Sequence, residues 1–312
     1  MKFLFVMDPA STMLPDKDTT FALMRASQAR GHQCYSCQPS DVHAHGARLS
    51  ATALPTQVSD RAPHVSLGEA ARLDLHALDA IFIRKDPPFD VEYLHLTQLL
   101  ELVKSHTFVC NDPAGLRGAN EKLFALQFQS WMPTTLVTKD RAAILEFVKQ
   151  VGGAAVLKPL DGAGGSGVVA LRSEDKNTRA LVDILTHEGK HWAMVQEFQP
   201  GISEGDKRVL MLNGKPLGAI LRVPRADDIR ANIHVGGSVF ATELTDHERT
   251  LCAAVGPTLV EHGLYFVGLD LIGGKLIEVN VTSPTGIQEL GRLTASSPEN
   301  DVIGWVESQV IA

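Results

Sequence analysis

The 312-residue sequence predicts an α/β fold. At roughly 150 residues per domain, this length indicates two or three domains. The chain opens with the order strand, helix, strand, which is typical of a parallel sheet. An apolar strand at residues 80–83 ends in the charged segment Arg84-Lys85-Asp86-Pro87-Pro88, and α/β sheets place ligands at such strand ends. From residue 151 onward, short strands and tight turns replace the parallel pattern.

The first element is an apolar run at residues 3–7. It ends at Asp8, which makes it shorter than the roughly 7 to 15 apolar residues of a secretory signal, so we interpret it as a buried strand. A helix is expected over residues 19–30, with Asp18 as its N-cap and Gly31 just beyond its end.

The rest of the first domain is less regular. A strand is expected near Cys34, whereas residues 41–75 show no clear period and predict a loop-rich segment with a hairpin around residues 48–58. A helical pattern restarts at residues 120–130. We therefore place the first domain boundary near Gly118.

The last part of the chain predicts a sheet of short strands. Four of them are expected at residues 154–158, 168–172, 194–198 and 208–212. Asn213-Gly214 then indicates a hairpin, because a type I′ turn needs positive φ at both positions. A helix over residues 246–262, closed by Gly263, precedes a final hairpin.

Composition narrows the class of protein. The net charge of −7 argues against a general nucleic-acid binder, which needs a basic field to neutralise phosphates. No run approaches the ~20 apolar residues of a membrane helix, so we expect a cytoplasmic protein without a membrane partner. The four cysteines fit reduced thiols.

Cys34 and Cys37 form a C-x-x-C motif, and His32, His43 and His45 are close in the sequence. This arrangement raises the hypothesis of a zinc or redox site. A second pair of ligands is missing from the sequence, and Cys34 falls in a predicted strand. The motif is therefore kept only as an alternative.

A glycine-rich loop follows the strand at residues 154–158. Four glycines in six positions leave backbone N–H groups free to surround a polyphosphate. The loop comprises Asp161, Gly162, Ala163, Gly164, Gly165, Ser166 and Gly167. It matches neither the Walker pattern nor G-x-G-x-x-G, and a flexible surface turn is the alternative. Lys158 before the loop and Lys122 at the head of an earlier helix are candidate phosphate ligands.

The final hairpin, residues 268–280, carries three oxygen-bearing side chains. Glu278 and Asn280 share a face because side chains alternate along a strand. Asp270 joins them if the loop is residues 273–275, whereas a two-residue loop places it on the other face. Two carboxylates and an amide suit Mg²⁺ better than zinc, and a solvated polar face is the alternative.

The apolar side chains of this hairpin predict a core face. They are Leu269, Leu271, Ile277 and Val279.

Basic residues recur in the predicted strands of the last third of the chain, at Arg208, Arg222 and Arg230. Arginines there stabilise charge on a transferring phosphoryl group or bind a substrate carboxylate. The sequence has no Ser/His/Asp or Cys/His nucleophile signature, which favours phosphoryl chemistry by positioning and electrostatics.

Taken together, these residues resemble the ATP-grasp superfamily and, within it, the bacterial glutathione synthetases. The resemblance covers nearly the whole chain. The segments that carry it are Met7-Asp8-Pro9, residues 84–90, Leu116-Arg117, Asn120-Glu121-Lys122-Leu123, residues 158–167 and residues 280–286.

The resemblance implies an ATP-grasp fold behind an N-terminal Rossmann-like domain at residues 1–118, with a small lid at 119–198 and a catalytic subdomain at 199–312. It implies that ATP contacts Lys122, Lys158 and the glycine loop, including Asp161, Gly162, Gly164, Gly165 and Gly167. Gln196, Glu197 and Phe198 would surround the adenine and ribose, and Asp270, Glu278 and Asn280 would hold Mg²⁺ or Mn²⁺.

The implied reaction joins γ-glutamylcysteine and glycine through an acyl phosphate, with release of ADP and phosphate. The resemblance makes Arg208, Arg230 and Asn232 the catalytic candidates, and it places Arg84, Ser283, Pro284 and Thr285 against the peptide and glycine. A homo-oligomer is also implied.

Two alternatives stay open at this point. Another ATP-grasp carboxylate–amine ligase would share the nucleotide and metal residues, and a catalytically silent ATP-binding module would act as a regulator. Ala163, Ala231 and His234 depart from the usual pattern of the family, which leaves room for an altered amine substrate.

Overall fold

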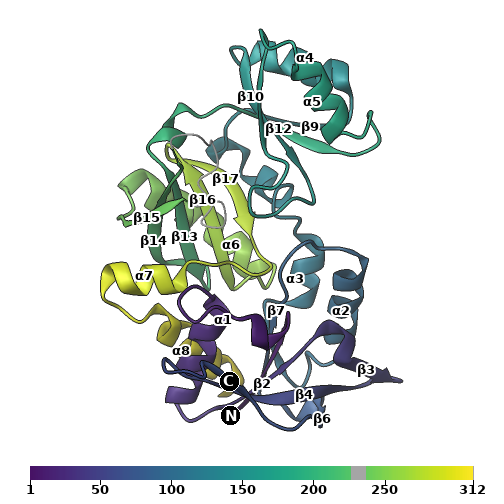
Figure 1. Ribbon diagram of the computed structural model, residues 1–312, viewed down its shortest axis with the longest axis vertical. Coiled ribbons are helices and arrows are strands. Elements are labelled where there is room, and N and C mark those ends of the chain that lie inside the picture. Colours follow the sequence, from purple (N-terminus) through teal and green to yellow (C-terminus); the bar gives the residue numbers. More distant parts are fainter. Residues whose placement is uncertain (226–236, 312) are drawn as a thin grey trace.

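The computed structural model describes residues 1–225 and 237–311 as three sheets with flanking helices (Figure 1). The N-terminal sheet lies at one end of the molecule and a small four-stranded sheet at the other, with the C-terminal sheet between them. Arg230 and Asn232, two of the predicted catalytic residues, and the departures Ala231 and His234 lie outside the described residues.

The N-terminal sheet has the strand order β3-β4-β2-β1-β7-β8, with β5 and β6 also paired to β4. The neighbouring strands β2, β1, β7 and β8 are parallel, as the opening of the sequence predicts. The strands are β1 (Lys2–Met7), β2 (Gln33–Cys37), β3 (Val42–His45), β4 (Arg48–Val58), β5 (Val65–Leu67), β6 (Ala71–Asp74), β7 (Ala80–Arg84) and β8 (Phe108–Cys110).

The prediction for residues 41–75 was wrong. This segment forms β3 to β6, and Arg48–Val58 is one continuous strand of 11 residues rather than a hairpin. The strand buries Leu49, Ala51 and Ala53 at alternate positions against the core. Alanine and threonine contribute little hydrophobic contrast, so the alternation is weak in the sequence.

Three α-helices belong to this part of the chain: α1 (Thr19–Ala29), α2 (Val91–Glu101) and α3 (Pro113–Gly118). Helix α1 confirms the predicted helix, and Gly31 follows it with φ of 83°. Asp18 occupies the N-cap position, but its side chain does not cap the helix. Its Oδ2 accepts a hydrogen bond from the Leu14 N–H at 2.6 Å instead.

The small sheet has the antiparallel order β11-β10-β12-β9. Its strands are β9 (Thr135–Thr138), β10 (Ala154–Pro159), β11 (Val169–Arg172) and β12 (Ala193–Glu197). Helices α4 (Arg141–Gln150) and α5 (Thr178–Leu185) pack against it around a separate apolar cluster. The glycine-rich loop connects β10 to β11.

The C-terminal sheet has the antiparallel order β15-β14-β13-β16-β17. Its strands are β13 (Asp206–Leu212), β14 (Lys215–Val223), β15 (Ser238–Ala241), β16 (Phe266–Ile272) and β17 (Lys275–Asn280). Asn213 and Gly214 have φ of 46° and 74°, which confirms the predicted β13–β14 turn. The helices are α6 (Asp246–Glu261), α7 (Ile287–Thr294) and α8 (Pro298–Ile311).

Short 3-10 helices complete the connections. They are η1 (Ala10–Thr12), η2 (Pro39–Asp41), η3 (Leu75–Ala77), η4 (Phe124–Trp131) and η5 (Pro200–Ser203). Of these, η4 occupies the place of the helical pattern predicted at residues 120–130 and covers strand β17.

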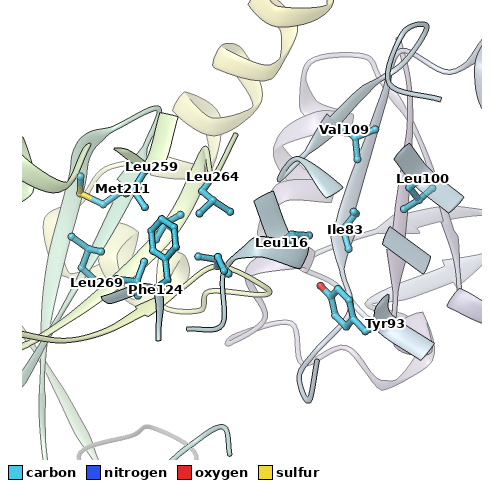
Figure 2. Close-up of a cluster of buried hydrophobic side chains, with 14 of the residues drawn as sticks. Ile83, Tyr93, Leu100, Val109, Leu116, Phe124, Met211, Leu259, Leu264 and Leu269 are labelled. Carbon is cyan, nitrogen blue, oxygen red and sulfur yellow. The ribbon is translucent and has the colours of Figure 1, made fainter. Parts of the chain in front are cut away.

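One apolar core joins the N-terminal and C-terminal sheets. Figure 2 shows Leu116 and Phe124 between a group around Ile83 and a group around Leu269. These side chains are almost fully excluded from solvent, and each contributes about 1.5–3 kcal/mol to folding by the burial of apolar surface. This shared core fixes the two sheets relative to each other.

Helix α8 packs beside α1 although the two are separated by almost the whole chain (Figure 1). Its Val302, Ile303 and Val306 belong to the same apolar cluster as Phe3 and Phe5 of β1. At its far end, Glu307 accepts a 2.8 Å hydrogen bond from Nε of Arg30. The last helix of the chain therefore completes the core of the first sheet.

Among the described helices, none has the length and apolar character needed to cross a membrane.

Candidate active site

A cavity of about 500 Å³ is lined by residues from all three sheets. It collects most of the predicted site residues, which are far apart in the sequence. Those that line it are Arg84, Lys122, Lys158, Gly162, Gly164, Gly165, Gln196, Glu197, Phe198, Arg208, Asp270, Glu278, Asn280, Ser283, Pro284 and Thr285.

The glycine loop lies over the cavity with residues 162–165 in its lining. Gly164 and Gly165 have φ of 61° and 82°, a conformation that side-chain-bearing residues rarely adopt. Asp161 is exposed, and Gly167 packs against Pro159; neither lines the cavity. We expect these two residues to shape the loop rather than to touch ATP.

Lys158 lies at the end of β10 with its side chain buried. Its Nζ donates a 2.5 Å hydrogen bond to Oε1 of Gln196 on the neighbouring strand β12. Burial lowers the pKa of Lys158 to about 8. A cation held this way is directed at the cavity and has no carboxylate within ion-pair distance among the described residues.

Lys122 connects the loop to the metal candidates. Its Nζ lies 3.0 Å from Oε1 of Glu278 and donates a 2.6 Å hydrogen bond to the carbonyl oxygen of Gly162. The side chain is almost fully buried. One ammonium therefore contacts both the phosphate-loop candidate and a predicted metal ligand.

The predicted adenine and ribose residues lie on and just after strand β12. Glu197 is partly exposed, and its Oε2 accepts hydrogen bonds from the N–H and Oγ1 of Thr134 at 3.3 and 3.0 Å. Gln196 binds Lys158 through its oxygen and Thr135 through its nitrogen, at 3.2 Å. The side chain of Gln196 therefore positions Lys158, which is a role that the sequence did not indicate.

The β16–β17 hairpin resolves the uncertainty about register. Its loop has two residues, Gly273 and Gly274, which by itself would put Asp270 on the wrong face. A β-bulge on β17, between the Asp270–Glu278 and Leu271–Leu276 pairs, restores the alignment. Asp270 therefore lies opposite Glu278, and the predicted grouping of the three polar side chains forms.

The bulge also corrects the prediction for the apolar face. Ile277 lines the cavity instead of the core, and Leu276 takes its place in the core with no exposed surface. Leu269, Leu271 and Val279 are buried as predicted. The extra residue at the bulge shifts the alternation by one position.

The donor set fits a hard divalent cation. Oδ2 of Asp270 accepts a 3.1 Å hydrogen bond from Nδ2 of Asn280, so these side chains are adjacent. Burial opposes the ionisation of Asp270, but Arg208 and Arg222 outweigh it and hold its pKa well below the usual range. An ionised carboxylate, Glu278 paired with an ammonium, and an amide oxygen are the ligand types that Mg²⁺ prefers.

No group of three or more His, Cys, Asp or Glu side chains suited to a metal occurs in the part of the chain that the structure describes. The third ligand candidate here is an amide.

Arg208 forms a two-point ion pair with Asp270. Its Nε and Nη2 lie 2.5 and 3.0 Å from the two carboxylate oxygens, and its Nη1 donates a 3.2 Å hydrogen bond to the carbonyl of Thr285. These contacts fix the guanidinium at the junction of the metal candidates and the turn at residues 283–285.

Arg222 and Asp206 belong to the same buried group. Nη2 of Arg222 lies 2.6 Å from both oxygens of Asp206 and 2.9 Å from Oδ1 of Asp270. Its Nε is buried without a hydrogen-bond partner. The sequence offered Arg222 only as one basic residue among several, and nothing in it singled out Asp206.

Glu121 is a further residue that the sequence did not assign. Its Oε1 accepts hydrogen bonds from Val281 N–H, Thr282 N–H and Thr282 Oγ1 at 2.9, 3.1 and 2.8 Å. It thus ties the segment before Lys122 to the turn that follows Asn280. The sequence pointed to Glu121 only through the motif Asn120-Glu121-Lys122, in which it lies.

The C-x-x-C alternative fails on geometry. Cys34 and Cys37 are three residues apart on strand β2, so their side chains point to opposite faces of the sheet, into two different apolar clusters. Burial raises the pKa of each thiol to about 12. The two sulfur atoms cannot share a metal ion or form a disulfide in this fold.

Solved structures resemble this fold as a whole. D-cycloserine synthetase DcsG matches with a TM-score of 0.68 and 14% identity, over 98% of this chain and 99% of that one. The ATP-grasp ligase PsnB, complexed with precursor peptide PsnA2 and AMPPNP, matches with a TM-score of 0.64 and 16% identity, over 99% and 98%. The chain therefore has the fold of these ligases and synthetases.

The sequence comparisons narrow the class further. Residues 1–117 match the family described as prokaryotic glutathione synthetase, N-terminal domain, and residues 121–295 match prokaryotic glutathione synthetase, ATP-grasp domain. Glutathione synthetase of Synechococcus elongatus is 45% identical over 99% of each chain. That of Mesorhizobium japonicum is 41% identical over 94% of this chain and 93% of its own. The chain belongs to the prokaryotic glutathione synthetase family.

Proposed function

We propose that this protein uses ATP to join γ-glutamylcysteine to glycine. Family membership supports the ligase over a silent ATP-binding module and over a ligase of different substrates. The observation that carries the proposal is the single cavity in which phosphate-binding, charge-stabilising and peptide-binding candidates meet.

The phosphate end of the cavity binds ATP through cations and backbone. Lys158, directed by Gln196, and Lys122 supply positive charge, and the glycine loop supplies N–H groups. Glu197 accepts hydrogen bonds from the ribose hydroxyls. Binding of the phosphates draws Lys122 away from Glu278, because the ammonium then has a stronger anionic partner.

The metal is part of the proposal. Asp270, Glu278 and Asn280 hold Mg²⁺ or Mn²⁺, which neutralises charge on the transferring phosphoryl group when bound. Arg208 is anchored on Asp270 and on the carbonyl oxygen of Thr285. From this position it contacts the carboxylate that attacks the γ-phosphate.

The reaction then proceeds in two displacements. The cysteinyl carboxylate of the peptide takes the γ-phosphoryl group and ADP leaves. The amine of glycine next attacks the acyl phosphate, loses a proton, and phosphate departs. Closure of the glycine loop keeps water from the acyl phosphate.

Two roles extend beyond the described residues. Arg230 and Asn232 lie outside the described residues and stay predicted catalytic residues. The cytoplasmic location and the homo-oligomer likewise stay predictions.

The test is release of phosphate by the purified protein with ATP, Mg²⁺ and γ-glutamylcysteine, with and without glycine, followed by mass analysis. We expect glycine-dependent phosphate release and a tripeptide product. Tight ATP binding with no turnover on any carboxylate–amine pair would refute the ligase, and turnover with another amine would correct the substrate. A Glu278→Gln variant serves as the inactive control.

A further inference from the structure

Two consecutive residues, Glu121 and Lys122, lie in the short connection between α3 and η4. Lys122 has a role in the proposed ATP site, whereas the proposed chemistry gives Glu121 none. Glu121 nevertheless lines the same cavity. Its hydrogen bonds all run to one segment of the C-terminal sheet, and they assign it a task of its own.

Glu121 holds the end of strand β17 and the two residues that follow it. Its backbone carbonyl accepts a 3.0 Å hydrogen bond from the N–H of Val279. Its Oε1 accepts hydrogen bonds from the N–H of Val281 at 2.9 Å and from the N–H and Oγ1 of Thr282 at 3.1 and 2.8 Å. Asn280, a metal-ligand candidate, lies between these residues. Glu121 therefore fixes the backbone on both sides of Asn280.

The segment after β17 depends on these contacts because it is buried at the last strand of its sheet. Strand β17 ends the strand order, and Val281 and Thr282 are 0% and 5% exposed. Buried backbone groups without a partner are costly. The carbonyl oxygen of Val281 accepts a 2.8 Å hydrogen bond from Nδ2 of Asn111, a buried side chain directly after β8. Two side chains from earlier segments thus fix the residues that lead from Asn280 to the turn at residues 283–285.

The residue next to Glu121 belongs to the ATP end of the cavity. Nζ of Lys122 lies 3.0 Å from Oε1 of Glu278 and donates a 2.6 Å hydrogen bond to the carbonyl oxygen of Gly162. A planar peptide bond joins the two neighbours, with their Cα atoms about 3.8 Å apart. Phosphates that hold Lys122 therefore also restrict Glu121, and Glu121 restricts the turn at residues 283–285. Two ligands that order the same segment favour each other's binding.

We propose that Glu121 is a positioning residue that couples the binding of ATP to the binding of the peptide donor. It acts through its hydrogen bonds to Val281 and Thr282, which make Asn280 and the turn at residues 283–285 one unit with Lys122. The inference rests on the proposed function. It implies that the γ-phosphate and the attacking carboxylate are aligned only when both ligands are bound.

The test measures the coupling itself. The Kd of the ATP analogue AMP-PNP with Mg²⁺ would be determined by calorimetric titration with and without saturating γ-glutamylcysteine, and the ratio of the two values is the coupling factor. Glu121→Ala removes the carboxylate, whereas Glu121→Gln keeps an acceptor at the Oε1 position. Thr282→Val removes one donor with little change in shape. Steady-state kcat and KM with ATP would be measured for the same variants.

Glu248→Ala is the matched control. Glu248 is a buried glutamate whose Oε2 accepts hydrogen bonds from the N–H of Thr245 at 2.8 Å and from Nζ of Lys207 at 2.6 Å. None of these three described residues lines the cavity. Loss of this carboxylate should lower the Tm and leave the coupling factor unchanged. A purely structural role of Glu121 would make the two alanine variants behave alike.

We expect the peptide to lower the wild-type Kd of AMP-PNP about fivefold or more, within the usual range of coupling between two sites. In Glu121→Ala the coupling factor should fall to within about twofold of one, and the KM for γ-glutamylcysteine at saturating ATP should rise by a similar factor. The Kd of AMP-PNP alone should change less than about threefold, because Lys122 and the glycine loop remain. Glu121→Gln should keep most of the coupling, and Thr282→Val should lose part of it.

An unchanged coupling factor in Glu121→Ala would overturn the assignment, and so would an equal loss in Glu248→Ala. An equal loss in Glu121→Gln and Glu121→Ala would also overturn it, because the negative charge rather than the hydrogen bonds would then be required. If Glu121→Ala does not fold, Thr282→Val decides by the same measurement. A wild type that turns over γ-glutamylcysteine without coupling refutes only this inference. A wild type with no activity on γ-glutamylcysteine refutes the proposed function as well.

Discussion

The buried ammonium of Lys158 predicts that ATP binding weakens as the pH rises from 7 to 9. Burial lowers the pKa of this group from 10.5 to about 8 in the free protein. The protonated fraction is then about 90% at pH 7 and about 10% at pH 9, from the usual titration relation. If only the cation binds phosphate, the apparent Kd for the ATP analogue AMP-PNP increases about tenfold over this range.

The assay is calorimetric titration of AMP-PNP at pH 7, 8 and 9 with Mg²⁺ present. Lys158→Arg is the diagnostic variant, because a guanidinium stays protonated throughout and should remove the pH dependence. Lys158→Met should bind weakly at every pH. An equally steep pH dependence in Lys158→Arg would show that another group titrates, and a flat wild-type profile would refute the lowered pKa.

The lowered pKa of Lys158 also makes the stability of the native state depend on pH. A lysine whose pKa is lowered by folding destabilises the native state while it is charged, so this penalty is present below pH 8 and disappears as the pH rises through about 8 to 10.5. The shift of about 2.5 pKa units corresponds to about 3 kcal/mol.

Further predictions concern the site and the packing. Glu278→Ala should abolish ADP release while leaving circular dichroism unchanged; wild-type turnover would exclude the metal assignment. Asp206→Asn should lower kcat about 10- to 100-fold by freeing Arg222, with the ATP KM nearly unchanged and partial recovery in Asp206→Glu; a loss confined to KM would contradict this positioning role. Gly115→Ala should destabilise the protein by about 1–3 kcal/mol in thermal melting, because a Cβ there would lie 2.0 Å from the carbonyl oxygen of His262; an unchanged Tm would show that the helix can shift. A thiol reagent should label no cysteine before unfolding, because burial raises the pKa of every thiol; rapid labelling of the native protein would refute this. These thiols are Cys34, Cys37, Cys110 and Cys252.

The parts of the fold with a strong hydrophobic period could be predicted from the sequence. Residues 3–7 and 80–83 are apolar without interruption, as expected of parallel strands buried on both faces, and they pair as β1 and β7. Residues 41–75 could not be predicted, because their strands carry small residues, and pairing with one another and with β2 supplies the stability that each strand's own sequence lacks.

Some residues of the candidate site could likewise be predicted from the sequence, and others could not. Glycine clusters and paired carboxylates have local patterns, so the loop and Glu278 could be found from spacing alone. The bulge beside Ile277 and the buried pair of Asp206 and Arg222 arise from cross-strand register, which two strands decide together.

The position of α8 bears on how the protein is made. Phe3 and Phe5 leave the ribosome long before Val302, Ile303 and Val306, which belong to the same apolar cluster. Until then, the nascent N-terminal sheet exposes aromatic surface that favours aggregation or chaperone binding. The N-terminal sheet is thus translated well before the helix that completes its core, and truncation within α8 should impair the folding of this sheet.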